Sequence, residues 1–170
     1  MKIRPIEPRD NEQIERIIKQ SLESFELNLP GTAYFDPQLA KLAEYYNSSP
    51  RMAYWVAVTD DETVVGGAGI GTFGKETEVC ELQKLYIAPE AQGNGLSRQL
   101  VEQALTFAAQ HYRYCYLETF DRLEVANALY LKFGFRQLDK PLDGTEHNAC
   151  DAWYMKELSS EGNASTASGQ

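Results

Sequence analysis

Gln92-Gly-Asn-Gly-Leu-Ser97 is the stretch that decides the fold, because of what stands on either side of it. An apolar run typical of a buried strand, 82–87, precedes it, and apolar residues at helical spacing over 95–112 follow it. Glycines let consecutive backbone N–H groups converge on one point, and a helix start adds partial positive charge. We therefore expect this strand, loop and helix to bind an anion such as a pyrophosphate.

On both sides of this strand, loop and helix, apolar periodicity predicts further strands and helices. Strands are expected at 1–8, 54–58, 63–72, 77–87, 114–119, 135–138 and 149–158. Besides the helix over 95–112, helices are expected at 10–22, 36–46 and 121–133. The second of these begins where Asp36 and Pro37 have the form of an N-cap and a first-turn proline. The order of elements predicts a mixed α/β fold in one domain.

A second glycine motif, 69–74, spells Gly-Xaa-Gly-Xaa-Xaa-Gly. The dinucleotide-binding fingerprint needs a helix after such a motif, whereas this one leads into another strand. Together with Gly66 and Gly67, these glycines indicate a bulge or a close approach of the backbone. We interpret them as a packing feature.

The residues Leu129-Tyr-Leu-Lys-Phe-Gly-Phe135 lie about one strand and one helix beyond the first motif. The pairing of Gln-Gly-Xaa-Gly-Xaa-small with Leu-Tyr-Xaa-Lys-Xaa-Gly-Phe resembles the GNAT superfamily of acetyl-CoA-dependent N-acetyltransferases. The resemblance covers residues 1–158. It implies a central, mostly antiparallel sheet with one parallel pair of strands, flanked by about four helices.

This resemblance also implies where coenzyme A binds. The backbone of Leu85, Tyr86 and Ile87 would pair with the pantetheine arm. The pyrophosphate would be held by Gln92, Gly93, Asn94, Gly95, Leu96 and Ser97. Tyr130 matches the family's tyrosine beside the coenzyme sulfur. The chain departs from the family pattern at Leu123, where many members carry an asparagine that binds pantetheine.

Acyl transfer from a thioester to an amine needs a neutral amine, stabilisation of the oxyanion and a proton for the departing thiolate. Backbone amides near Tyr86 and Ile87 are candidates for the oxyanion, and the Tyr130 hydroxyl is the candidate proton donor. Glu81 is the first candidate for the base, because a glutamate within a mostly apolar strand needs a partner or a wet cleft. Glu118 in the neighbouring strand is the second. The residue pattern leaves both open.

The acceptor is expected to bind opposite coenzyme A. Phe25, Tyr34 and Phe35 could supply aromatic walls, and acidic residues of the last loop could attract a cation. These acidic residues are Asp139, Asp143 and Glu146. The combination favours an amine as acceptor.

Composition narrows the classes of partner. The 170 residues include 25 acidic and 16 basic ones, and the formal charge of −9 has the wrong sign for a nucleic-acid partner. No apolar run approaches the roughly 20 residues that cross a bilayer, and no secretory signal is visible, so a cytoplasmic protein without a membrane partner is expected. Cys80, Cys115 and Cys150 fit neither a disulfide framework nor a zinc site. The polar tail, 159–170, is expected to be flexible.

These expectations define an acyltransferase with acetyl-CoA as co-substrate and without a metal. We expect it to move the acetyl group to a primary amine of a small molecule by direct attack. Two alternatives stay open: a protein or peptide N-acetyltransferase, and a non-catalytic, regulatory module that binds coenzyme A. A homodimer is also left open.

Overall fold

The computed structural model describes residues 1–145 and 147–158. Glu146 and residues 159–170 lie outside the described part of the chain. The flexible tail and the role suggested for Glu146 therefore stay predictions.

Seven strands form one sheet in the order β1-β2-β3-β4-β5-β7-β6. Neighbouring strands are antiparallel except for β4 and β5, which are parallel. The predicted fold class, with its single parallel pair, is confirmed. The strands are β1 (Lys2–Pro5), β2 (Ala53–Val58), β3 (Val64–Thr72), β4 (Val79–Ile87), β5 (Tyr114–Thr119), β6 (Arg136–Leu138) and β7 (Ala152–Glu157).

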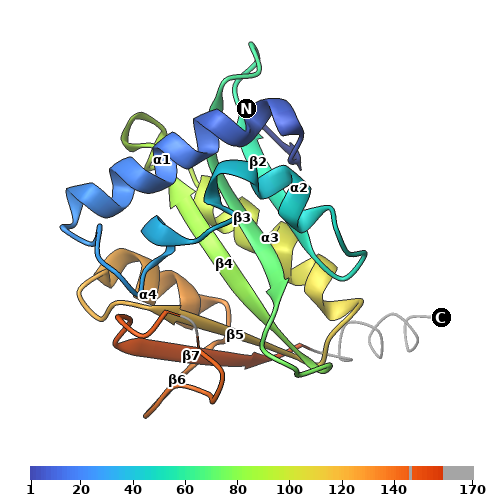
Figure 1. Cartoon of the computed structure of the whole chain (residues 1–170), viewed down its shortest axis with the longest axis vertical. Helices are drawn as coiled ribbons and strands as arrows, with labels where there is room; N and C mark the ends of the chain where they lie inside the picture. The colour runs from blue at the N-terminus through green and yellow to red at the C-terminus, as the bar shows by residue number, and fades with distance from the viewer. Residues whose placement is uncertain (146, 159–170) are drawn as a thin grey trace.

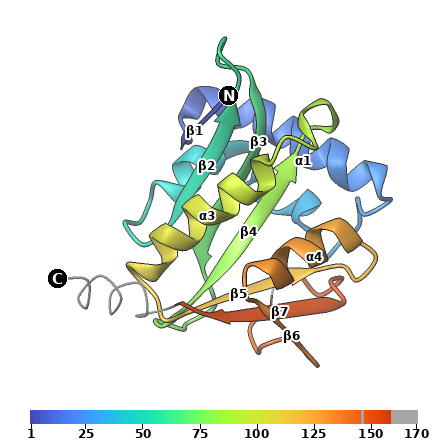
Figure 2. The same ribbon diagram turned by 180° about the vertical axis from the view of Figure 1, so that it is seen from behind.

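Helices cover both faces of the sheet. Figure 1 shows α1 (Asn11–Ser24) and α2 (Leu42–Tyr46) in front of the sheet, and Figure 2 shows α3 (Leu96–Ala109) and α4 (Glu124–Lys132) on the opposite face. Each layer has its own apolar core, because α1 and α3 bury one side of their amphipathic surfaces against the strands. The two cores hold the sheet rigidly between them, and α3 provides the crossover that a parallel pair requires.

The predicted start of the second helix is wrong. Asp36 and Pro37 do not open a helix; a short 3-10 turn at Leu39–Lys41 leads into α2 instead. The Asp36 side chain is used in a buried ion pair with Lys84. The sequence has the pattern of an N-cap, but the Asp36 carboxylate pairs with Lys84 instead of capping a helix.

Candidate active site

The parallel strands β4 and β5 are paired only over the first three residues of each strand. Their pairing runs from Val79 opposite Tyr114 to Glu81 opposite Tyr116 and ends there. Beyond that point the two strands diverge (Figure 1), and a cavity of about 120 Å³ lies between them. The polar side chains that line this cavity come from Thr32, Glu81, Gln83, Lys84, Tyr86, Glu118, Thr119, Tyr130, His147 and Cys150.

A bulge in β4 forms one wall of this cavity. Between two paired positions, β3 advances from Gly67 to Gly69 while β4 spans Gln83 to Tyr86, so β4 carries one residue more. Lys84 takes up the extra length with a φ of +52°. Because pairing with β5 has already ended, the edge of β4 that faces β5 has no strand partner along residues 85–87 in the described structure. This edge is where the sequence predicts contact with pantetheine.

Two side-chain amides hold the glycine loop: one bonds the end of β4 and the other bonds the turn that precedes the loop. The Gln92 amide donates to the Ile87 carbonyl at 3.2 Å. The Asn94 amide donates to the Ala91 carbonyl at 3.1 Å. Both side chains therefore have a structural task in the loop, in addition to the binding role predicted for them.

The same loop leaves main-chain donors unused at the start of α3. Gly93 and Gly95 have φ angles of +83° and +75°, which L side chains rarely adopt. Within the described structure, no acceptor is found for the N–H groups of residues 93–98, and the first bond of the helix runs from the Gln99 N–H to the Gly95 carbonyl. These free donors at a helix N-terminus are suited to an anion such as the pyrophosphate of coenzyme A.

Glu81 is a buried carboxylate in the cavity, with 8% of its surface exposed. One of its oxygens accepts a hydrogen bond of 2.7 Å from the Gln83 amide. Burial raises the pKa of Glu81 to about 7, opposed by the Gln83 hydrogen bond and assisted by the nearby charge of Glu118. A carboxylate with that pKa can take up and release a proton near neutrality.

Glu118 has a different environment, although it lines the same cavity. The Tyr116 hydroxyl donates to one of its oxygens at 2.9 Å, and the Thr145 hydroxyl donates to the other at 2.5 Å. The Tyr116 oxygen in turn accepts from the Leu142 N–H at 3.2 Å. Glu118 thus ties the loop before β7 to β5, whereas the Glu81 carboxylate holds no loop in this way.

Tyr130 reaches the cavity from α4. Its ring packs against Phe135 and Tyr154, with centroids 6.0 and 5.7 Å apart. Burial raises the pKa of Tyr130 above its ordinary value of 10, so the hydroxyl keeps its proton at neutral pH. Among the described residues this hydroxyl has no hydrogen-bond partner, which leaves it available to donate.

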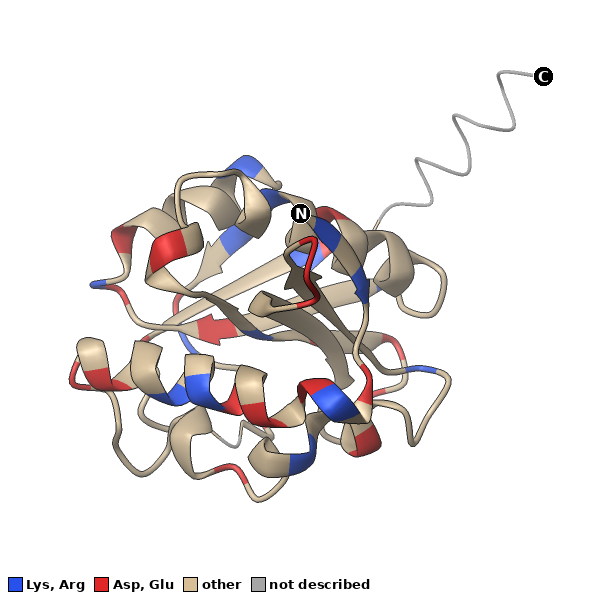
Figure 3. Cartoon of the chain, turned by 90° about the horizontal axis from the view of Figure 1, so that it is seen from above, with Lys and Arg blue, Asp and Glu red and all other residues tan. Residues whose placement is uncertain are grey.

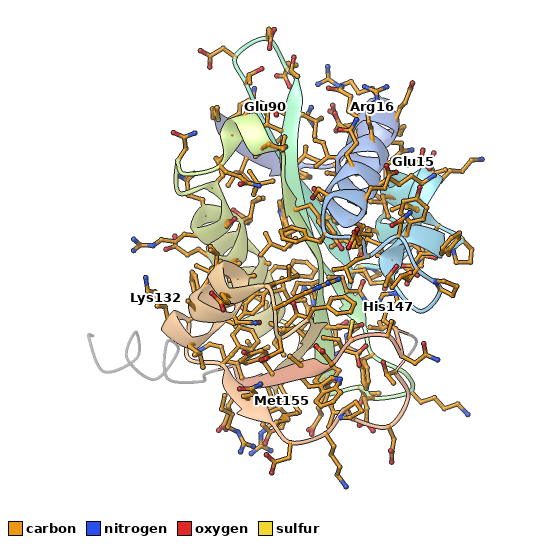
Figure 4. The ribbon with its side chains drawn as sticks, turned by 90° about the vertical axis from the view of Figure 1, so that its left-hand side faces the viewer. Glu15, Arg16, Glu90, Lys132, His147 and Met155 are labelled. Carbon is orange, nitrogen blue, oxygen red and sulfur yellow. The ribbon has the colours of Figure 1, made fainter. Side chains whose placement is uncertain are left out.

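Three residues that meet at one end of the cavity were not predicted as part of the site: Lys84 and His147 line the cavity, and Asp36 lines the adjoining pocket. Lys84 pairs with Asp36 at 2.7 Å, and the His147 Nε2 lies 2.9 Å from the same carboxylate. Burial alone would raise the Asp36 pKa, but His147 and Lys84 outweigh it and lower the value, while Asp36 raises the pKa of His147 despite that residue's burial. His147 lies in the loop that leads to β7 (Figure 4). No sequence pattern links these three distant positions.

Several predicted residues lie outside the cavity. Phe25 and Phe35, expected to be aromatic walls, are more than half exposed, and neither they nor Tyr34 line the cavity, so that expectation is wrong. Leu123 does line it. Asn127 holds the loop after β5 through its amide, which donates to two loop carbonyls.

The cysteines are free, as predicted, and the described residues hold no cluster of His, Cys, Asp or Glu suited to a metal ion. Cys150 lines the cavity, and burial raises its pKa to about 12, so its thiol stays protonated. No helix of the described residues is long and apolar enough to cross a membrane. Figure 3 shows acidic and basic residues interspersed along the helices and loops of the described chain.

Comparison with known proteins identifies the class that this fold and cavity define. The model of the acetyltransferase (GNAT) family matches residues 15–135, and the chain belongs to that family. Among curated relatives, the uncharacterized N-acetyltransferase YjgM of Escherichia coli K12 is 39% identical over 153 residues, which cover 88% of this chain and 90% of YjgM. The chain is thus an acyltransferase of a family that uses acetyl-CoA.

Solved structures agree on the fold. A GNAT acetyltransferase from Staphylococcus aureus Mu50 has a TM-score of 0.78 at 20% identity, covering 93% of this chain and 99% of that one. A phosphinothricin acetyltransferase from Sinorhizobium meliloti, solved in complex with AcCoA, has a TM-score of 0.70 at 19% identity, covering 92% and 88%. At such identities the likeness concerns the fold alone.

Proposed function

We propose that this chain transfers the acetyl group of acetyl-CoA to a primary amine of a small molecule by direct attack. The observation that carries the proposal is Glu81, a buried carboxylate whose pKa of about 7 suits a general base, in the cavity where β4 and β5 separate. Amines are mostly protonated at neutral pH, so the reaction needs such a base next to the acceptor.

The residues of the chain fit acetyl-CoA, which supplies a thioester already activated for acyl transfer. The unused N–H groups of residues 93–97, at the start of α3, would hold its pyrophosphate. The unpaired edge of β4 along residues 85–87 would bind the pantetheine arm and direct an N–H toward the thioester carbonyl. Both sets of donors belong to the main chain, so their positions are fixed before the substrate arrives.

Two side chains would then move protons. Glu81 removes a proton from the ammonium group of the acceptor, directly or through a water, and is ready to do so because about half of it is ionised near pH 7. The Tyr130 hydroxyl, which keeps its own proton and has no partner among the described residues, donates to the departing thiolate. Attack by the neutral amine needs no covalent intermediate on the protein, and Cys150, held as a thiol by burial, is a poor nucleophile.

A small acceptor is favoured over a protein because two loops meet across the cavity. The Ala149 N–H donates to the Gly31 carbonyl at 3.2 Å, which joins the segment after α1 to the segment before β7. Asp36 and His147 join the same two segments a second time. A bound peptide would have to separate these contacts, whereas a small amine would not.

The test is an amine library screened by free-thiol detection with acetyl-CoA. We expect thiol release with at least one small primary amine, and loss of that release in Glu81→Gln. An amine-terminated peptide set, run in parallel, tests the protein alternative. Release with peptides alone would overturn the small-acceptor part. Coenzyme A that raises the melting temperature without thiol release from any acceptor would instead indicate a non-catalytic binding module.

A further inference from the structure

A chain of two hydrogen bonds connects Tyr46, the last residue of α2, with Glu81. The Tyr46 hydroxyl donates to the Gln83 side-chain oxygen at 2.6 Å. The Gln83 side-chain nitrogen donates to the Glu81 carboxylate at 2.7 Å. Tyr46 is completely buried, and burial holds the pKa of its hydroxyl well above 10, so it keeps its proton throughout the neutral range.

The third strand makes room for this chain of bonds. An added Cβ on Gly71 would lie 2.3 Å from the Gln83 side-chain oxygen and 2.9 Å from its nitrogen. Any larger residue at position 71 would therefore displace the amide that joins Tyr46 to Glu81. Gly71 belongs to the glycine motif that we interpreted as a packing feature, and the Gln83 amide is what packs against it.

The direction of the two hydrogen bonds follows from which groups can donate and which can only accept. An ionised carboxylate only accepts, so the Gln83 nitrogen must face Glu81, and the Gln83 oxygen must face Tyr46. Were the amide reversed to accept from a protonated Glu81, the Tyr46 hydroxyl would face a nitrogen. The Tyr46 hydroxyl would then lose its acceptor, because in the described structure it donates to the Gln83 oxygen. The buried tyrosine thus favours the orientation that stabilises ionised Glu81.

We propose that Tyr46 and Gln83 are positioning residues that orient the Glu81 carboxylate and favour its ionised state. The inference rests on the proposed role of Glu81 as base, and it assigns that base a supporting pair that the sequence did not reveal. Other charged groups that act on Glu81 are Glu118 on β5, Lys84 on β4 and His147 in the loop before β7. Each of them stays in place when Tyr46 or Gln83 is changed.

The test compares Tyr46→Phe and Gln83→Leu with the wild-type chain over pH 5.5–9. Removing either donor destabilises ionised Glu81, so the acidic limb of kcat/KM should move to higher pH, by about one unit for Gln83→Leu. Tyr112→Phe is the matched control, because it removes a buried hydroxyl that donates to the Arg51 carbonyl at 2.7 Å and does not line the cavity.

A second readout does not depend on turnover. The carboxyl ¹³C signal of Glu81 reports its titration by NMR, and its midpoint should rise in both variants and stay unchanged in Tyr112→Phe. Gly71→Ala, which keeps every hydrogen-bonding group, should raise the midpoint as well and covers the case in which Tyr46→Phe does not fold. If the Glu81 midpoint of every folded variant equalled that of the wild type, the inference would be overturned. A shifted midpoint in a chain without activity on any amine would retain it and refute the proposed base instead.

Discussion

The two halves of the candidate site are built from different parts of the chain. The donor half, proposed for acetyl-CoA, consists of main-chain groups from one continuous segment, residues 85–97. The acceptor half consists of side chains from distant segments, among them Asp36, Glu81, Glu118 and His147. Main-chain donors depend on backbone geometry and tolerate many side chains, whereas the acceptor half can change with single substitutions. Under the proposed function, the first half would set the reaction and the second would set its acceptor and its base.

The sharpest way to test this division is Glu81→Gln. An amide cannot take a proton from the acceptor, so kcat should fall by roughly 10²–10⁴-fold. The thermal shift produced by coenzyme A should not change, because Glu81 belongs to the acceptor half. Steady-state thiol release and melting curves measure the two effects.

Glu118→Gln is the matched control for that substitution. It keeps an acceptor for the Tyr116 and Thr145 hydroxyls and lies in the same cavity. A smaller loss, about tenfold or less, is expected if Glu118 mainly holds the loop. An equal or larger loss than in Glu81→Gln would reverse the assignment of the base.

The same carboxylate should make stability depend on pH. Its pKa is raised from 4.5 to about 7 in the folded chain, so between these values the unfolded state loses the proton first. The free energy of unfolding therefore falls as pH rises through this window, by about 1–3 kcal/mol from this group. Glu81→Gln has no carboxyl group at this position to ionise, so its free energy of unfolding does not fall in this window. It should therefore be more stable than the wild type at pH 8, but not at pH 4.5.

Urea unfolding at the two pH values measures the difference. Glu157→Gln, which changes an exposed glutamate on β7, serves as the control and should show the same stability relative to wild type at both. A Glu81→Gln difference that does not vary with pH would show that the carboxylate has an ordinary pKa.

Gly95→Ala tests the donor half. A φ of +75° strains any L side chain, so alanine should shift the loop and misplace its N–H groups. The KM for acetyl-CoA should rise by about tenfold, whereas the KM for the amine should change little. Gly134→Ala, at a φ of +88° after α4, imposes a similar backbone cost away from the loop. If Gly134→Ala raised the KM for acetyl-CoA equally, general destabilisation would explain the effect.

The donor half was readable from the sequence because its signal is local. The motif at 92–97 needs a strand before it and a helix after it, and both are visible within 30 residues as apolar periodicity. The strand and helix bounds of β4, α3 and β5 lie close to those predicted. The candidate base Glu81 was also found, since a charged residue within an apolar strand stands out.

Apart from Glu81 and Glu118, the acceptor half was not readable from the sequence, for a physical reason. Asp36 has the pattern of an N-cap, and only the fold brings Lys84 and His147 to it. Lys84 has 2% of its side chain exposed because a bulge changes the direction of β4, which strict alternation does not predict. The Tyr46 hydroxyl likewise reaches Gln83 across 37 residues. Contacts between distant segments carry no periodic signal in the chain.

Tyr130→Phe probes the point where the two halves meet, and its effect should be confined to turnover. The variant keeps the ring packing against Phe135 and Tyr154 and removes only the hydroxyl. Turnover should fall by about tenfold, with the KM for acetyl-CoA within twofold of wild type, because proton donation to a thiolate assists a leaving group that is already good. A thioester with a more acidic leaving thiol should recover part of the loss. Unchanged turnover with acetyl-CoA would assign Tyr130 to packing and leave the departing thiolate to be protonated by water.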